Sequence, residues 1–175
     1  MASVIAGPGS SACVTLCEPS RGRRPTIPEM PETGHTVRLE FPSLFDMIDL
    51  VQAVSDQLTR ILRLDEDSQH WVGVAVRESV INAIKHGNRG DPFKPVTVEF
   101  TLTPPADPCE IVIRVRDRGE GFDPEALPDP LAPENLLKAS GRGIFFMRSF
   151  MDDVQIYRVN GGGMEVRMVK RFTRS

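Results

Sequence analysis

The sequence predicts a two-layer α+β sandwich, with a mixed, mostly antiparallel sheet and about three helices on one face. Several stretches alternate apolar and polar residues with a period of two, which is typical of strands that have one covered face. The helical stretches are grouped rather than strictly interleaved with the strands, which favours α+β over α/β. A chain of 175 residues suits one domain with a core that needs no disulfide or metal.

Composition limits the classes of function. The chain has 21 Lys+Arg against 24 Asp+Glu, and its formal charge of −3 argues against a general binder of nucleic acid or membrane surfaces. No apolar run approaches the roughly 18–20 residues of a membrane span. Three cysteines without a CxxC pair do not indicate a disulfide framework, so a reducing, cytoplasmic location is predicted.

The chain is expected to divide into a tail and one domain. Residues 1–34 contain five prolines, many Ser, Thr and Gly residues, and no sustained apolar period. This composition predicts a flexible extension, and its start lacks the basic and long apolar parts of a secretory signal. Residues 35–175 form the predicted folded domain.

The first elements of this domain follow from periodicity. Val37 to Phe41 read as a strand, and Ser43 is the expected cap of a helix over residues 44–62. A second helix is predicted to start after Asp65 or Asp67 and to end near Gly87, a favourable C-terminal glycine.

Strands dominate the rest of the domain. Further strands are predicted at 96–102, 111–115, 154–159 and 164–170, the last two around the turn 160–163. A Pro/Asp-rich connection covers residues 123–140, and a short apolar helix follows at 144–151. So long an irregular connection is uncommon in compact domains and often serves as a lid over a ligand.

The second helix is apolar over most of its circumference. Its broad apolar arc contains Val72, Val76, Val80, Ala83 and Ile84. The narrow stripe that remains carries Glu78, Asn82 and His86, spaced by four residues and therefore stacked along the helix. Because such a helix must be largely buried, the stripe is predicted to face an internal cleft; an ordinary solvated face is the alternative.

A carboxylate ends the strand at 111–115. The period of two places Asp117 on the same face as the apolar side chains of that strand, where a charge is costly unless it is hydrogen-bonded. Gly119 and Gly121 follow, and glycine lets a backbone approach a ligand closely. The alternative is a strand end with an Asx turn.

A glycine-rich turn precedes the last predicted helix. Gly141, Arg142 and Gly143 lead into Ile144, and a turn of this kind at a helix N-terminus presents free N–H groups that favour phosphate. Lys138 and Arg142 add positive charge there. A glycine-capped helix start without a ligand is the alternative.

Taken in order, the three features describe a site for ATP with a nearby base. Asp117 can accept a hydrogen bond from the adenine amino group, and the glycine turn can hold phosphates. Asn82 can offer an oxygen to Mg²⁺, which prefers hard oxygen ligands. Glu78, one helical turn before Asn82, can accept a proton from an attacking hydroxyl group.

This constellation resembles the GHKL, or Bergerat-fold, superfamily of ATP-binding domains. Residues 78–87 (ESVINAIKHG) look like its N box, 117–122 (DRGEGF) like its first glycine box, and 141–144 (GRGI) like its second. The NAIKHG run and the FMDDV run at 150–154 are similar to bacterial anti-sigma regulatory factors with serine/threonine protein kinase activity. The likeness covers roughly residues 36–172.

The resemblance implies residue roles. Glu78 would be the catalytic base, Asn82 the Mg²⁺ ligand and Asp117 the adenine ligand. The other residues that the resemblance places at the nucleotide are His86, Gly119, Gly121, Phe122, Lys138, Gly141, Arg142, Gly143 and Ile144. One departure stands out, because the family often has Gly-Thr where this chain has Gly163-Met164. Either adenine affinity is weaker or another donor replaces that hydroxyl.

The resemblance also implies partners. Such kinases hold an RNA polymerase sigma factor inactive and phosphorylate a Ser or Thr of a STAS-domain anti-anti-sigma protein. They often act as dimers, so the resemblance allows a homodimer. Neither nucleic acid nor a membrane is an expected direct partner. An ATP-binding partner-switching module without significant kinase activity is the main alternative. A detached histidine kinase domain is disfavoured, since the predicted helix at 44–62 contains no phospho-accepting His.

Overall fold

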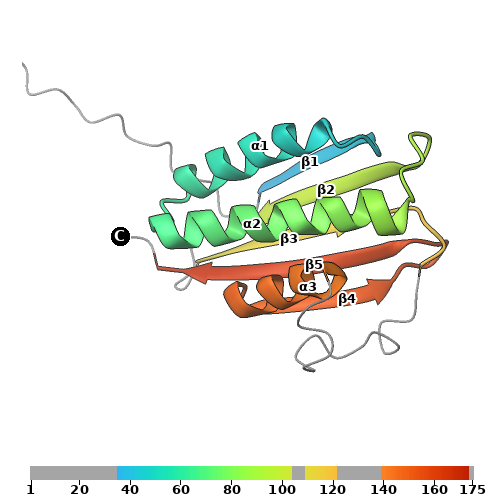
Figure 1. Cartoon of the computed structure of the whole chain (residues 1–175). Helices are drawn as coiled ribbons and strands as arrows, with labels where there is room; N and C mark the ends of the chain where they lie inside the picture. Colours follow the sequence, from blue (N-terminus) through green and yellow to red (C-terminus); the bar gives the residue numbers. More distant parts are fainter. Residues whose placement is uncertain (1–34, 104–108, 122–138, 174–175) are drawn as a thin grey trace, which may run out of the picture.

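The computed structural model describes residues 35–103, 109–121 and 139–173. Within these ranges, a five-stranded sheet and three α-helices form an α+β sandwich, which confirms the predicted fold class (Figure 1). The elements in chain order are β1 (His35–Pro42), α1 (Met47–Ile61), α2 (Glu66–Asn82), the π-helical segment η1 (Ala83–Gly87), β2 (Pro95–Leu102), β3 (Cys109–Arg116), α3 (Ala139–Phe150), β4 (Asp153–Arg158) and β5 (Met164–Phe172).

The strands lie in the order β1-β2-β3-β5-β4, and all four described pairings are antiparallel. All three helices pack on the same face of this sheet, with α2 in the middle between α1 and α3 (Figure 1). The predicted extension over residues 1–34 and the turn at 104–108 lie outside the described residues.

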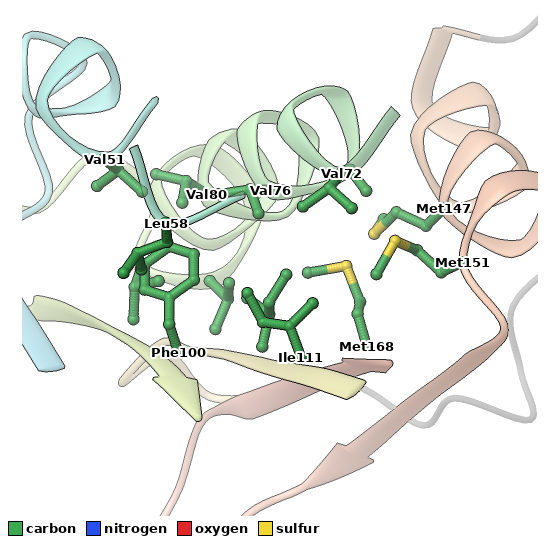
Figure 2. Packing of buried hydrophobic residues seen from close by; sticks show 14 of the residues in the cluster. Val51, Leu58, Val72, Val76, Val80, Phe100, Ile111, Met147, Met151 and Met168 are labelled. Carbon is green, nitrogen blue, oxygen red and sulfur yellow. The ribbon is translucent and has the colours of Figure 1, made fainter. Parts of the chain in front are cut away.

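The core lies between α2 and the sheet. Val72, Val76 and Val80 project from α2 toward Phe100 of β2, Ile111 of β3 and Met168 of β5 (Figure 2). These side chains are all buried, as the apolar arc of α2 and the alternating pattern of the strands predict. Helix α1 adds Ile48, Val51 and Leu58, which its spacing of three and seven residues places on one side.

Ser43 is not the cap of α1, contrary to the sequence prediction. The helix begins at Met47, its N-cap is Asp46, and no side chain caps it. Ser43 is buried instead, where its Oγ donates to the carbonyl of Lys94 at 2.6 Å and accepts from Asn88 Nδ2 at 2.8 Å. The hydroxyl group is therefore used in a contact between distant chain segments rather than in the local helix.

The second predicted helix keeps its predicted start and end but changes type in its last turn, and the last helix begins earlier than predicted. Asp65 caps α2 by accepting from Ser68 N at 2.8 Å, but the last turn, Ala83–Gly87, is π-helical and thus wider than an α-turn. Helix α3 begins at Ala139 rather than at Ile144. Gly141 and Gly143 therefore lie inside the first turns of α3 and do not form a separate loop before it.

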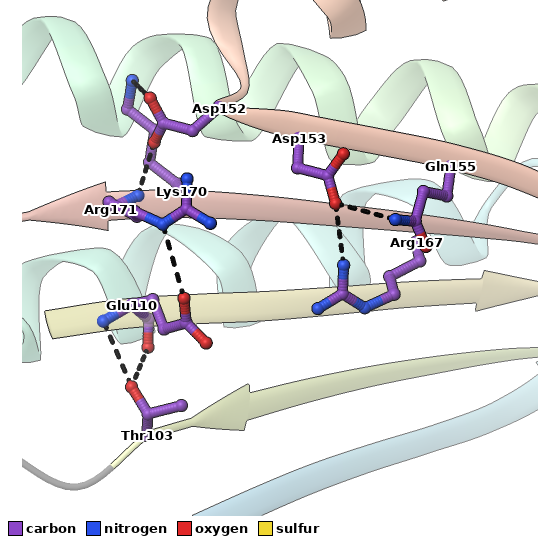
Figure 3. Close-up of polar contacts among 8 residues, drawn as sticks. All are labelled: Thr103, Glu110, Asp152, Asp153, Gln155, Arg167, Lys170 and Arg171. Atoms are coloured by element: carbon purple, nitrogen blue, oxygen red, sulfur yellow. Dashed lines mark hydrogen bonds and ion pairs between the residues drawn. The ribbon is translucent and has the colours of Figure 1, made fainter.

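The other face of the sheet is covered by none of the described helices and is mostly polar, apart from the buried pair Val112 and Val169. Cross-strand pairs join neighbouring strands on this face, including Arg167 of β5 with Asp153 of β4 at 3.0 Å and Arg171 of β5 with Glu110 of β3 at 3.7 Å (Figure 3). Among the described helices, none is both long enough and apolar enough to cross a membrane.

Candidate functional site

Asp117 follows β3 and is buried against the end of α2, with 5% of its surface exposed. Its Oδ1 accepts the backbone N–H of Gly119 at 2.8 Å and that of Met164 at 3.1 Å. Within the described residues, no protein donor reaches its Oδ2. Burial raises the pKa of Asp117 above its ordinary value, against the opposing effect of the two N–H groups and Arg116. The side chain is thus fixed through one oxygen and has the other available as an acceptor.

Two glycines let the backbone close around Asp117. A Cβ at Gly87, the last residue of η1, would overlap the Asp117 carboxyl group and lie 2.7 Å from Asp117 Cβ. A Cβ at Gly119 would overlap the carbonyl oxygen of Gly87 and lie 2.7 Å from its carbonyl carbon. Any side chain at either position would therefore displace the carboxylate or the end of the helix.

Met164 begins β5 beside Asp117, at a position where the family that the sequence resembles often has a threonine. Its side chain is 3% exposed, and its backbone N–H, rather than a hydroxyl group, donates to Asp117. Gly163 before it has φ +88, and a Cβ there would overlap the carbonyl oxygen of Asp117. The backbone N–H of Met164, rather than a side chain, therefore holds Oδ1 of the Asp117 carboxylate.

Glu78 and Asn82 form a second group on α2, and both are half-buried. They face α3 at Gly143, where an added Cβ would lie 2.8 Å from Glu78 Oε2 and 3.5 Å from Asn82 Nδ2. The polar stripe therefore faces a neighbouring helix at these two residues, and the second glycine motif lies directly against it.

The remaining predicted site residues differ in where they lie. His86 is exposed, and the wider turn of η1 changes the angular position that a spacing of four residues assumes. Gly121 has φ +73 and approaches Met164 Sδ, with a Cβ position 3.3 Å away. Ile144 is half-buried in α3, whereas Gly141 and Arg142 belong to its first turn. Phe122 and Lys138 lie outside the described residues.

Together, the three motifs lie along one helix. The segment from Glu78 to Gly87 rises roughly 13 Å along the helix axis, with Gly143 against its start and Asp117 against its end. At one end, the carboxylate of Glu78 and the amide of Asn82 lie in a narrow space against Gly143. At the other end, Asp117 offers a buried hydrogen-bond acceptor. Such a ridge can hold an elongated ligand that has an amino group at one end and an electrophile at the other.

Sequence reasoning missed Asn88, which organises the Asp117 end. This side chain is fully buried. Its Nδ2 donates to Ser43 Oγ and to the carbonyls of Lys94 and Pro95 at 2.8–3.1 Å, and its Oδ1 accepts the N–H of Arg118 at 2.8 Å. An Asn after a helix-terminal Gly reads as an ordinary turn residue, so no local pattern distinguishes it.

Comparison with known proteins gives one family match. A sequence model described as the histidine kinase-like ATPase domain matches residues 41–170. The crystal structure of the RsbU and RsbW domains of a Mycobacterium tuberculosis protein is similar, with a TM-score of 0.58 and 16% identity over 81% of this chain and 33% of that one. At this identity the likeness shows a shared fold.

Several curated proteins are similar in sequence. The serine-protein kinase RsbW of Listeria monocytogenes serotype 4a is 31% identical over 50% of this chain and 57% of its own length, so the chain spans little more than half of it. The anti-sigma F factor of Anoxybacillus flavithermus is 32% identical over 64% of this chain and 74% of its own length. The serine-protein kinase RsbW of Staphylococcus epidermidis is 27% identical, over 81% and 89% respectively.

Proposed function

We propose a function for this chain on the premise that it belongs to the histidine kinase-like ATPase domain family, whose members use ATP. In this proposal the chain is an anti-sigma regulatory factor and a serine/threonine protein kinase. It phosphorylates a STAS-domain anti-anti-sigma protein, holds a sigma factor inactive, and works in the cytoplasm. The names of the relatives, serine-protein kinase RsbW and anti-sigma F factor, support it.

One observation carries the proposal: an acceptor and a base lie at opposite ends of a single helical ridge. Asp117 offers Oδ2 at one end, and we assign it the adenine amino group. Glu78 and Asn82 lie at the other end, against Gly143. The glycines at 87 and 143 leave room for the carboxylates of Asp117 and Glu78, because a Cβ at either position would overlap or crowd them. A Cβ at Gly119 would overlap the carbonyl oxygen of Gly87.

The residues at the Glu78 end fit the chemistry of phosphoryl transfer. Asn82 carries an amide oxygen of the hard type that Mg²⁺ accepts, and a bound Mg²⁺ would neutralise charge that develops on the phosphate oxygens. Glu78 accepts the proton of the partner's Ser or Thr hydroxyl group while that oxygen attacks the γ-phosphorus of ATP; the bond between the γ-phosphorus and the β–γ bridging oxygen breaks, and ADP leaves. Helix α3 approaches the Glu78 carboxylate closely at Gly143, where an added Cβ would lie 2.8 Å from Oε2.

Met164 keeps a second function open, an ATP-binding partner-switching module without significant kinase activity. The thioether of Met164 gives no hydroxyl hydrogen bond beside Asp117, where the family often has one. Its backbone N–H binds Oδ1 instead. If adenine is held too loosely for productive transfer, partner binding would persist without phosphorylation.

A phosphotransfer assay separates the two functions. Purified chain is incubated with γ-labelled ATP, Mg²⁺ and a candidate STAS-domain protein, and label on the partner is measured beside nucleotide affinity. We expect Glu78→Gln to reduce transfer by about 10²–10⁴-fold with nucleotide affinity little changed. Glu66→Gln, an exposed position at the start of the same helix, is the matched control. Full transfer by Glu78→Gln contradicts the role of Glu78, and partner binding without transfer by the unmodified chain favours the module.

A further inference from the structure

A pocket of about 120 Å³ lies on the polar face of the sheet, opposite the helices. Four arginines and two glutamates surround it: Arg38, Arg114, Arg116, Arg118, Glu99 and Glu165. They come from β1, β2, β3, β5 and the residues just after β3. Arg114 and Arg116 alternate with Val115 and Asp117, which face the helices, so the sheet separates this pocket from the candidate nucleotide site.

The charges in the pocket do not cancel. Arg38 pairs with Glu99 at 3.3 Å, and Arg114 lies 3.7 Å from Glu165. In the part of the chain that the structure describes, neither Arg116 nor Arg118 has an acidic side chain within ion-pair distance. Arg38 also pairs with Glu40 at 3.1 Å, so the four arginines outnumber Glu40, Glu99 and Glu165 by one, and the local charge is about +1 in a chain whose formal charge is −3. Arg116 and Arg118 are the two guanidinium groups of the pocket without an acidic partner among the described residues.

Arg116 has a buried donor atom that is available to a ligand. Its Nε is buried and has no hydrogen-bond partner among the described residues. A buried donor without a partner destabilises the fold, and proteins satisfy nearly all such groups. The position is on a paired strand in the middle of the sheet, where β3 lies between β2 and β5, so the side chain is anchored on rigid backbone.

We propose that this pocket binds a phosphate-type dianion. Arg116 and Arg118, which have no acidic partner among the described residues, can each bind an oxygen of a dianion, and the planar fork of arginine suits the oxygens of a phosphate group. The pocket volume suits one such group rather than a whole nucleotide. Inorganic phosphate and a phosphate ester share this chemistry, and separate titrations with phosphate and with O-phosphoserine distinguish them.

The test follows the Arg116 side chain directly. In ¹⁵N-labelled full chain, the guanidinium Nε–H resonance that disappears in Arg116→Gln identifies Arg116. We expect inorganic phosphate, O-phosphoserine or both to shift this resonance along a saturable curve, whereas chloride at equal ionic strength does not. Arg118→Gln, an exposed position, should weaken the affinity by about tenfold or more. Arg60→Gln in α1 makes the same charge change on the helical layer and should leave the affinity unchanged.

Three results would overturn the proposal. One is a shift that does not saturate with either probe. Another is a chloride titration that reproduces the phosphate curve, since the effect would then be general screening. The third is an equal loss of affinity in Arg60→Gln and Arg118→Gln. If Arg116→Gln does not fold, a neighbouring guanidinium or backbone amide of β3 reports the same titration, and Arg118→Gln still decides the outcome.

Discussion

Gly87 packs directly against the carboxyl group of Asp117, so closely that the Cβ of any other residue at position 87 would overlap it. The last residue of η1 and the first residue after β3 thus meet without a side chain between them. Since Oδ1 of Asp117 is taken by two backbone N–H groups, this contact also sets the direction in which Oδ2 is open. The candidate site therefore requires a residue without a side chain at position 87, in addition to any role of Gly87 in ending the helix.

Gly87→Ala should damage both the fold and the site. The new Cβ must push aside Asp117 or the end of η1, which we expect to lower the free energy of unfolding by about 1–3 kcal/mol. Nucleotide affinity should fall by about tenfold or more. Urea denaturation and calorimetric titration measure the two effects. Gly73→Ala in α2 is the control, because its Cβ would crowd the flexible end of Gln52 and make an ordinary contact with Asp56 Oδ1 at 3.5 Å; equal affinities in both variants would refute the role of Gly87.

Asp117→Asn should separate binding from stability. Burial raises the folded-state pKa of Asp117 above 3.8, so the folded chain holds this proton more tightly than the unfolded chain. The contribution to stability is therefore fully present below pH about 3.8 and is lost as the pH rises through the folded-state pKa. Asparagine keeps an oxygen for the N–H groups of Gly119 and Met164 but carries no charge.

We expect Asp117→Asn to abolish nucleotide binding while the fold at neutral pH becomes no less stable than that of the unmodified chain. Unfolding measured between pH 3.5 and 7 should show that the stability of the unmodified chain relative to Asp117→Asn decreases as pH rises. Asp67→Asn, exposed in the first turn of α2, controls for the change in net charge. Unchanged nucleotide affinity, or a stability difference of the opposite slope, contradicts the assignment.

Gly143→Ala should impair transfer more than folding. Alanine is favoured over glycine inside a helix by about 1 kcal/mol, and α3 includes position 143. The new Cβ would lie 2.8 Å from Glu78 Oε2, so the carboxylate must turn away. We expect phosphotransfer to fall by about tenfold to a hundredfold with thermal stability unchanged or higher. Normal transfer in a folded Gly143→Ala protein would show that the contact with Glu78 is not needed.

The sequence predicted those parts of the fold and the candidate site that depend on period and local order. The period of two placed Asp117 on the buried face of β3, and the spacing of four placed Glu78 and Asn82 together on one side of α2. Both placements need only the geometry of a single element, which short-range residue patterns encode. The alternation of apolar and polar residues in the strands was likewise enough to predict one covered sheet face.

The features that the sequence did not predict depend on contacts between distant segments. Ser43 has the residue type of a helix cap, yet it bonds to Lys94 and Asn88. The glycines at 141 and 143 have the type of a loop, yet they are helical, because α3 must come close to Glu78. In each case tertiary contact overrides a local preference worth about 1 kcal/mol, which no pattern along the chain records.

Asn88→Ala tests the most important of these missed contacts. The variant removes the acceptor of Arg118 N–H and leaves the carbonyls of Lys94 and Pro95 without their shared donor in a fully buried place. We expect a loss of about 2–4 kcal/mol in the free energy of unfolding, since several buried groups lose partners at once. Asn160→Ala, in the exposed turn between β4 and β5, should change stability by less than about 0.5 kcal/mol.

Nucleotide affinity distinguishes a merely structural Asn88 from one that positions Asp117. Measured at low temperature on the folded fraction, Asn88→Ala should bind nucleotide more weakly than the unmodified chain. Arg118 follows Asp117 directly, and the bond from Arg118 N–H to Asn88 anchors the strand end that carries Asp117. Asn88→Asp keeps an acceptor for Arg118 but removes the donor, so its affinity per folded molecule should exceed that of Asn88→Ala even though its fold is also weakened. If both folded variants bind as tightly as the unmodified chain, Asn88 stabilises the domain without positioning the carboxylate.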